Sequence, residues 1–201
     1  DAENVLKKYC KEITFFKLSK VSVIWNVFKA YLTGKPLQVG YFFNGRAKKR
    51  VDQMIKRIEP DRIFCQLFRV AEYVKDSGIP GTIDYQDVFS AGIKRRLEKS
   101  KGFLRIILKI EYKRVLKYEK SIFGFFDNKI IISEPDRKLI PHPERDKIVI
   151  VPNGVDRDYF SPVVSDKKYD LVFTGNMNYP PNVLSAELIV REILPLLAKN
   201  R

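Results

Sequence analysis

The stretch GTIDYQDVFSAGIKRR, residues 81–96, passes directly from one kind of secondary structure to another. Its first four residues form a short β-rich run, and the residues after Asp87 predict a helix. Similar β-rich runs are found at 12–18, 38–43, 61–67, 129–133, 147–151 and 169–175. Helical stretches lie between them, at 19–32, 45–59, 68–76, 87–127 with a break at Lys101-Gly102, 134–139 and 182–199. Most strand runs lack a clean polar alternation, so the pattern predicts an α/β fold: a Rossmann-like parallel sheet with helices on both faces.

Length and composition limit the class of protein. With 201 residues, 45% of them hydrophobic, the chain can bury one core and part of a second. No apolar run approaches the roughly 18 residues needed to cross a bilayer, and DAENVLKKYC does not open as a signal peptide. Cys10 and Cys65 lie far apart and the chain has one histidine, so neither a disulfide framework nor a zinc cluster is expected. We therefore expect a soluble protein of the reducing cytoplasm.

The charge is strongly basic and unevenly distributed. The formal net charge is +14, of which residues 1–128 carry +13 and residues 129–201 carry +1. Such a field attracts nucleic acid, anionic lipid headgroups or phosphorylated substrates, without selecting among them. The basic residues are scattered over many predicted helices and no recognised nucleic-acid motif is present, so no specific nucleic-acid partner is expected. The basic run IKRRLEKSK, residues 93–101, is either a solvated helix face or a contact for phosphate or lipid.

Polar side chains follow two of the predicted strands. Asp84 ends the run GTID and Asp87 follows it, in the place where open α/β sheets collect their ligands. A carboxylate there could bind an acceptor hydroxyl or take its proton, while Asp87 could equally be a helix N-cap. Arg69 and Tyr73 follow the run DRIFCQL and would lie near the same sheet edge, although simple surface placement also explains them.

Two glycine-containing segments follow the later strands. After KIVIV, Pro152 cannot extend a central strand, and Asn153-Gly154 predicts a tight turn with positive φ angles. Taken alone, that segment indicates a β-turn in which Asp156 binds a nearby backbone N–H. The loop after YDLVFTG leads into a helix whose N-terminus could hold a phosphate, or it is an ordinary βα turn.

Taken together, these motifs resemble the retaining glycosyltransferases of family 4. The resemblance rests on DYQDVFS (84–90), KYEKSIFGFFDNKIIISEPDRKLI (117–140), IVIVPNGVDRDYFSP (148–162) and YDLVFTGNMNYPPNVLSAELIVREILPLL (169–197), in this order. It is closest to bacterial sugar transferases of exopolysaccharide and cell-envelope clusters, and is strong from about Pro60 onward. The family usually carries a histidine where this chain has Asp84.

The resemblance implies a GT-B fold, in which two Rossmann-like domains face a cleft. Residues 1–150 would form the acceptor-side domain, without its first strand, and residues 151–201 the hinge and first βα unit of the donor-binding domain. Asp84 and Asp87 would be the catalytic candidates, with Arg69 and Tyr73 on the acceptor side. The donor would be bound by Asn153, Gly154, Gly175, Asn176, Met177 and Asn182.

The implied function is transfer of a sugar, with retention, from a UDP- or GDP-linked donor to a lipid-linked or saccharide acceptor in polysaccharide biosynthesis. Neither a metal nor a cofactor is expected, and an anionic surface at the inner face of the plasma membrane is an expected partner. The family's pair of donor-binding glutamates would fall after Arg201, so these 201 residues resemble a piece of a larger enzyme, inactive in isolation. The alternatives are another GT-B enzyme, such as a nucleotide-sugar epimerase or a phosphorylase, and a basic nucleic-acid-binding protein.

Overall fold

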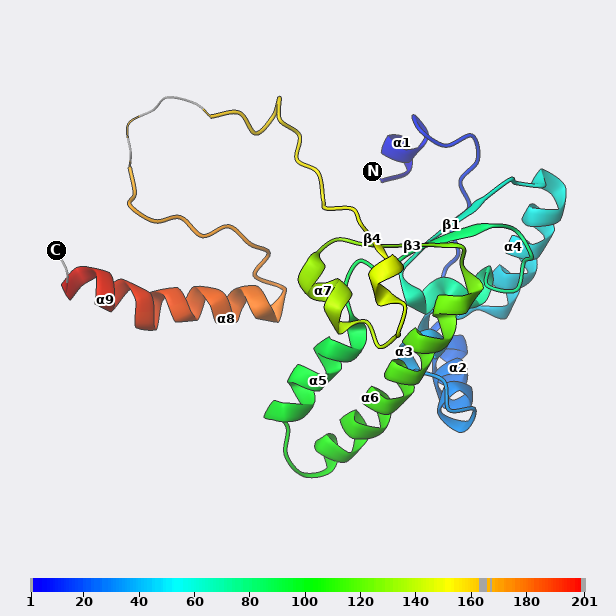
Figure 1. Ribbon diagram of the computed structural model, residues 1–201, viewed down its shortest axis with the longest axis horizontal. Helices are drawn as coiled ribbons and strands as arrows, with labels where there is room; N and C mark the ends of the chain where they lie inside the picture. The colour runs from blue at the N-terminus through cyan, green and yellow to red at the C-terminus, as the bar shows by residue number, and fades with distance from the viewer. Residues whose placement is uncertain (1, 163–165, 167, 200–201) are drawn as a thin grey trace. The chain divides into compact units, whose positions relative to one another are not determined.

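The computed structural model describes residues 2–162, 166 and 168–199 of the chain. The chain divides into two compact units, Asp1–Gly154 and Val155–Arg201. The first holds all the strands of the described residues and most of the helices (Figure 1). The second contains one long helical segment and the chain that leads to it.

The centre of the first unit is a four-stranded parallel sheet (Figure 1). Its strands are β1 (Ile63–Gln66), β2 (Gly81–Asp84), β3 (Asn128–Ile131) and β4 (Val149–Ile150), in the spatial order β1-β2-β3-β4. Each strand pairs in parallel with the next, and the register aligns Gln66 with Asp84, Asp84 with Ile130, and Ile130 with Val149. The predicted α/β class, a parallel sheet flanked by helices, is confirmed.

Helices flank this sheet in the first unit. They are α1 (Ala2–Leu6), α2 (Lys20–Leu32), α3 (Leu37–Phe42), α4 (Gly45–Ile58), α5 (Phe89–Lys99), α6 (Gly102–Ile122) and α7 (Glu134–Leu139), with short 3₁₀ turns η1 (Phe68–Tyr73), η2 (Phe123–Phe125) and η3 (Arg145–Lys147). The predicted break in the 87–127 stretch is confirmed, because α5 ends at Lys99 and Gly102 opens α6 with a φ of +59°. A glycine adopts that backbone conformation without strain.

Polar side chains fix where two of the helices begin. The Ser19 hydroxyl accepts a hydrogen bond from the N–H of Ser22 at the start of α2. The Asn44 side chain accepts from the N–H groups of Arg46 and Ala47 at the start of α4. Each cap satisfies backbone donors that have no partner inside the helix.

The main core lies against one face of the sheet. Cys65, Ile83 and Ile131 project from three neighbouring strands and are buried with Val115 and Ile122 of α6. Every strand connection steps in the same direction across the sheet, so the right-handed crossover rule places the connecting helices on one face.

The opposite face of the sheet is less covered. Phe64 and Val149, which point to that face by the register, are 62% and 59% exposed. The helical cover is therefore unequal on the two sides of the sheet.

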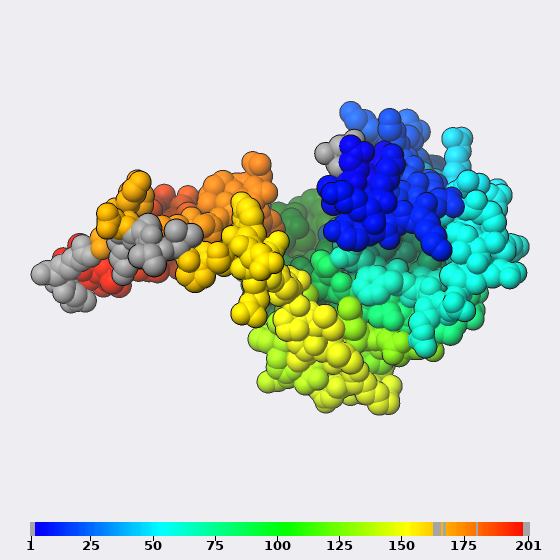
Figure 2. All heavy atoms as spheres, turned by 90° about the horizontal axis from the view of Figure 1, so that it is seen from above, coloured from blue at the N-terminus to red at the C-terminus, as the bar shows by residue number. Residues whose placement is uncertain are grey.

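The N-terminal segment lies on the surface of the first unit. Its atoms, dark blue in Figure 2, cover part of the cyan region that includes the end of α4. Glu12 forms an ion pair with Arg57 of that helix, and the Thr14 hydroxyl contacts the sulfur of Met54. Polar contacts of exposed side chains therefore hold this segment, in place of a strand pairing.

Three of the predicted strands do not form, and each failure has a physical reason. Residues 12–18 have no regular structure, and Phe15 and Phe16 are exposed, so this run finds no strand to pair with. Residues 38–43 lie mainly in helix α3, whose Gly40 packs tightly on Ala30 of α2. Packing between helices there overrides the β propensity of the aromatic run. Residues 169–175 are irregular, since the described part of the second unit offers no partner strand.

The predicted turn at Asn153-Gly154 is also wrong in its geometry. Neither residue has a positive φ, and residues 151–156 are irregular rather than a turn. The chain turns a few residues later, because Asp156 accepts hydrogen bonds from the N–H groups of Asp158 and Tyr159. The aspartate of this segment thus binds nearby backbone N–H groups as predicted, at a turn displaced toward the C-terminus.

The second unit contains α8 (Pro180–Leu188), a π-helical stretch at Ile189–Ile193, and α9 (Leu194–Lys199). Pro195 has no N–H to donate to the carbonyl of Arg191, which interrupts the α-helical hydrogen-bond ladder. Beside it, the N–H of Leu194 donates to Ile189, the longer pairing of a π-helix. The predicted helix at 182–199 forms, with this irregularity inside it.

Candidate functional site

The candidate site lies where the parallel strands of the first unit end. Asp84 closes β2 and is 9% exposed. One of its carboxylate oxygens accepts from the N–H of Gln86 at 3.0 Å, and the other accepts from the Gln86 side-chain amide at 3.3 Å. Gln86 has a φ of +59°, a strained conformation for this residue type. Asp84 therefore stabilises a sharp turn that directs the chain past the sheet edge.

Asp87 follows that turn and lies among charged groups from three other elements. Its burial and the nearby carboxylate of Asp136 raise its pKa, whereas the guanidinium groups of Arg69 and Arg95 lower it, and the net direction is upward. Arg69 comes from η1, Arg95 from α5 and Asp136 from α7. The predicted pair Arg69 and Asp87 thus lie in one electrostatic environment, together with two residues that sequence reasoning missed.

Asp87 does not cap α5. The N-cap position is Val88, which makes no side-chain capping bond, and the N–H of Asp87 donates to the carbonyl of Tyr85 at 2.8 Å. The alternative interpretation of Asp87, as the N-cap of this helix, is therefore wrong. The first turn of α5 is capped instead by Glu119 of α6, which accepts from the N–H of Ser90.

Arg69 is held by aromatic rings. Its guanidinium carbon lies 4.3 Å from the ring centre of Phe42 and 5.5 Å from that of Phe89. Contacts of this kind restrain a guanidinium while leaving its N–H donors free to bind anions. The arrangement supplies a fixed positive charge close to Asp87.

The Tyr73 hydroxyl makes hydrogen bonds to backbone groups of the protein itself. Its hydroxyl donates to the carbonyl of Phe42 at 2.8 Å and accepts from the N–H of Asn44 at 2.7 Å. Burial raises its pKa, and its ring lies 5.7 Å from that of Phe43. The hydroxyl links α3 to α4, so its polar capacity is used within the protein.

The predicted donor-binding residues are divided between the units. Asn153 and Gly154 follow β4 in the first unit and are exposed. Gly175, Asn176, Met177 and Asn182 belong to the second. The predicted donor site needs both sets, and it therefore stays a prediction.

Within the second unit, side chains organise the loop before α8. Asn176 accepts from the N–H of Asn178, and the Asn182 side-chain amide donates to the carbonyl of Asn176 at 3.0 Å. A Cβ at Gly175 would lie 3.0 Å from the amide of Asn182, so a glycine suits this close approach. Met177, in the same loop, is exposed.

The N-terminus of α8 has few free donors for a phosphate. Pro180 and Pro181, which open the helix, have no N–H. The N–H groups of Asn182 and Val183 donate to the carbonyl of Tyr179. An anion at this end would have to displace those bonds.

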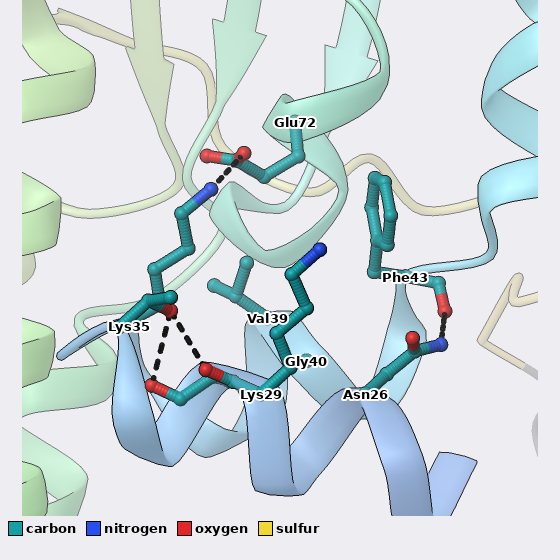
Figure 3. A pocket seen from close by; sticks show the side chains of 9 residues that line it. Asn26, Lys29, Lys35, Val39, Gly40, Phe43 and Glu72 are labelled. Carbon is teal, nitrogen blue, oxygen red and sulfur yellow. Dashed lines mark hydrogen bonds and ion pairs between the residues drawn. The ribbon is translucent and has the colours of Figure 1, made fainter. Parts of the chain in front are cut away.

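A separate cavity of about 220 Å³ lies between α2, α3 and η1 (Figure 3). Lys35 forms an ion pair with Glu72 at its wall, and Asn26 donates to the carbonyl of Phe43. Lys29 extends along the same space (Figure 3). Its lining comprises Asn26, Lys29, Ala30, Thr33, Lys35, Val39, Gly40, Phe43 and Glu72. No sequence signal points to this cavity, because its wall includes α3, whose residues have the composition of a strand.

Metal clusters and membrane-spanning helices are both absent from the described residues. Among residues 2–162, 166 and 168–199, no group of three or more histidine, cysteine or acidic side chains is arranged to hold a metal ion. In the same part of the chain, no helix is both long and apolar enough to cross a bilayer.

Comparison of the chain with protein-family models, curated proteins and solved structures finds no significant match in any of the three. The functional conclusion therefore rests on the residues at the sheet edge and on the motifs of the sequence.

Proposed function

We propose that this chain forms the acceptor-side part of a retaining glycosyltransferase of the GT-B type. The reaction would transfer a sugar from a nucleotide-linked donor to a hydroxyl of a lipid-linked or saccharide acceptor. The observation that carries the proposal is the position of Asp87, an exposed side chain at the carboxyl edge of a parallel sheet, in the electrostatic field of Arg69 and Arg95. The order of the motifs from DYQDVFS to YDLVFTGNMNYPPN supports the same interpretation.

The chemistry of the cluster suits an acceptor hydroxyl. Burial raises the pKa of Asp87, and a carboxylate with a raised pKa accepts a proton more readily from a reacting hydroxyl. Arg69 and Arg95 would balance the negative charge of a phosphate on the acceptor or the donor. Asp84, engaged by Gln86, would position the loop that carries Asp87.

The test compares two aspartate variants in the protein that carries this chain. ¹⁴C-labelled UDP- and GDP-hexoses are incubated with a lipid extract, and sugar transfer is measured for Asp87→Asn and for the exposed control Asp61→Asn. Loss of general-base assistance lowers the rate by about 10²–10⁴-fold, so we expect that loss for Asp87→Asn alone. Equal rates in the two variants, or no sugar transfer by the wild-type protein from any of these donors, would overturn the proposal.

A further inference from the structure

Helices α5 and α6 form a hairpin whose connecting loop lies at the end remote from the sheet (Figure 1). The first part of α6, beside that loop, exposes large apolar side chains. Phe103 is 76% exposed and Ile106 57% exposed, and Leu104, Ile107 and Ile110 are exposed as well. Leu108 alone among the large apolar residues of this part is buried in the core. These five residues, called the hairpin patch below, therefore leave a large part of their apolar surface uncovered within the described protein.

Exposed basic side chains are frequent in the same stretch of the chain as the hairpin patch. Glu98 is the one acidic residue between positions 93 and 110. The exposed basic residues in the same range include Lys94, Arg96, Lys99, Lys101, Arg105 and Lys109. An apolar surface on a helical hairpin so rich in exposed basic side chains is complementary to an anionic surface that also has an apolar interior.

A lipid bilayer has this combination. Interfacial helices bury aromatic and aliphatic side chains at the boundary of the acyl chains, while lysine and arginine side chains reach the headgroup phosphates. A nucleic acid would satisfy the charge but not the five apolar side chains. A protein partner would satisfy the apolar side chains, but it would also need a matching set of acidic groups.

We propose that the hairpin patch docks this protein on an anionic membrane, with α6 lying in the interface plane. Phe103 and Ile106 enter the acyl boundary, and Lys101 and Arg105 contact lipid phosphates. The hairpin patch is thus a defined surface for the attraction to anionic lipid that the net charge predicts. This docking proposal does not depend on the transferase proposal, since membrane binding needs neither a sugar donor nor an acceptor.

The first test measures flotation of the protein with vesicles of equal parts phosphatidylglycerol and phosphatidylcholine, and with pure phosphatidylcholine vesicles. We expect binding to the mixed vesicles alone, and at least a tenfold weaker partition for the double variant Phe103→Ser/Ile106→Ser. The matched control is Tyr159→Ser/Phe160→Ser, which removes two side chains that are 79% and 67% exposed in the second unit. Equal loss in both double variants, or no binding by the wild-type protein, would overturn the proposal.

A second pair of variants tests the charges. Lys101→Ser/Arg105→Ser should weaken partition about 30-fold, since each basic residue near an anionic surface changes binding roughly fivefold. The exposed control Lys49→Ser/Arg50→Ser on α4 removes the same charge away from the hairpin patch, and we expect at most a threefold effect. Equal weakening in both would show adsorption by net charge and overturn the proposed surface.

Insertion itself is tested by fluorescence. Trp25, the sole tryptophan of the chain, is replaced by Phe, and Phe103→Trp is added. We expect a blue shift of tryptophan emission when the mixed vesicles are added. Unshifted emission would overturn insertion. The proposal would also be overturned if Phe103→Ser/Ile106→Ser kept its vesicle partition and instead lost self-association or DNA binding, because the hairpin patch would then serve a protein or nucleic-acid partner.

Discussion

Glu119 of α6 accepts a hydrogen bond at 3.2 Å from the backbone N–H of Ser90 in the first turn of α5. Glu111, on the same helix, accepts one at 2.7 Å from the N–H of Leu37 at the start of α3. Neither α5 nor α3 has a capping side chain of its own. Two buried carboxyl groups of α6 therefore accept hydrogen bonds from backbone donors at the N-termini of two other helices.

The first prediction concerns the pH dependence that Glu119 confers. Burial raises its pKa from 4.5 to about 7, so the folded protein binds this proton more tightly than the unfolded chain does. The stabilising contribution is therefore complete below pH 4.5 and is lost as the pH rises to about 7. A pKa difference of this size between the folded and unfolded states changes the free energy of unfolding by an amount on the order of 3 kcal/mol.

Glu119→Gln should remove most of that dependence, because its amide oxygen can still accept from Ser90 and carries no charge. Urea unfolding, followed by circular dichroism at pH 5, 6, 7 and 8, measures how the free energy of unfolding changes with pH. The exposed Glu98→Gln serves as control and should retain the wild-type slope. A Glu119→Gln variant with the wild-type slope would contradict the assignment.

The second prediction concerns Glu72. Burial raises its pKa, but hydrogen bonds from Lys35, Lys75 and Tyr118 outweigh burial and hold it below the usual value. Glu72→Ala would leave those donors without their acceptor, and we expect a loss of about 1–3 kcal/mol in unfolding free energy. Lys35→Ala removes a side chain that is 44% exposed and should cost less than about 1 kcal/mol. Urea titrations of both variants at pH 7 decide whether this order holds.

The third prediction is steric and uses two helical glycines. A Cβ at Gly40 would lie 2.6 Å from the Cβ of Ala30 and 2.7 Å from the carbonyl oxygen of Asn26. Gly40→Ala should therefore destabilise the protein by about 1–3 kcal/mol, since α2 and α3 must separate. At Gly92 the nearest atom is the end of the Arg95 side chain at 3.9 Å, so Gly92→Ala should stabilise α5 by about 0.5–1 kcal/mol. Opposite shifts in melting temperature are the expected readout, and shifts of the same sign would refute this packing.

The fourth prediction concerns the charges around Asp87. Arg69 lowers the pKa of Asp87 and Asp136 raises it. Arg69→Met should thus move the pKa of Asp87 upward, whereas Asp136→Asn should move it downward. NMR titration of the ¹³C-labelled carboxyl group measures both, with the exposed Arg62→Met as a control that should leave the titration unchanged. Shifts in one common direction would show that the cluster is not assembled as described.

The sequence correctly predicts the four strands that form the sheet, each of which pairs with the next strand in chain order. GTID at 81–84 and the runs that overlap β1, β3 and β4 follow helices or turns with clear signals, and they form the sheet. Residues 38–43 have the composition of a strand, but Gly40 allows α3 to approach α2 closely. Local propensity cannot predict this contact between two helices.

The candidate site is predictable only in part. Asp84, Asp87 and Arg69 follow strands, and parallel strands bring their carboxyl ends to one edge, so their proximity follows from the order of the elements. Asp136 and Arg95 lie within helices, where spacing alone predicts a solvated face. Their effect on the pKa of Asp87 depends on how α5 and α7 pack in the folded chain, which the sequence pattern does not predict.

The connection between β2 and β3 has a consequence for the order of folding. These strands pair directly, yet the segment 85–127 separates them in the chain. Closing so long a loop costs entropy before any strand contact offsets it, whereas helices form within about a microsecond from local contacts. The α5–α6 hairpin shortens that loop, so we expect it to assemble early and the β2–β3 pairing to follow. The slow step of folding would then be the joining of two halves of the sheet, whose rate responds to mutations in the hairpin more than to mutations in the strands.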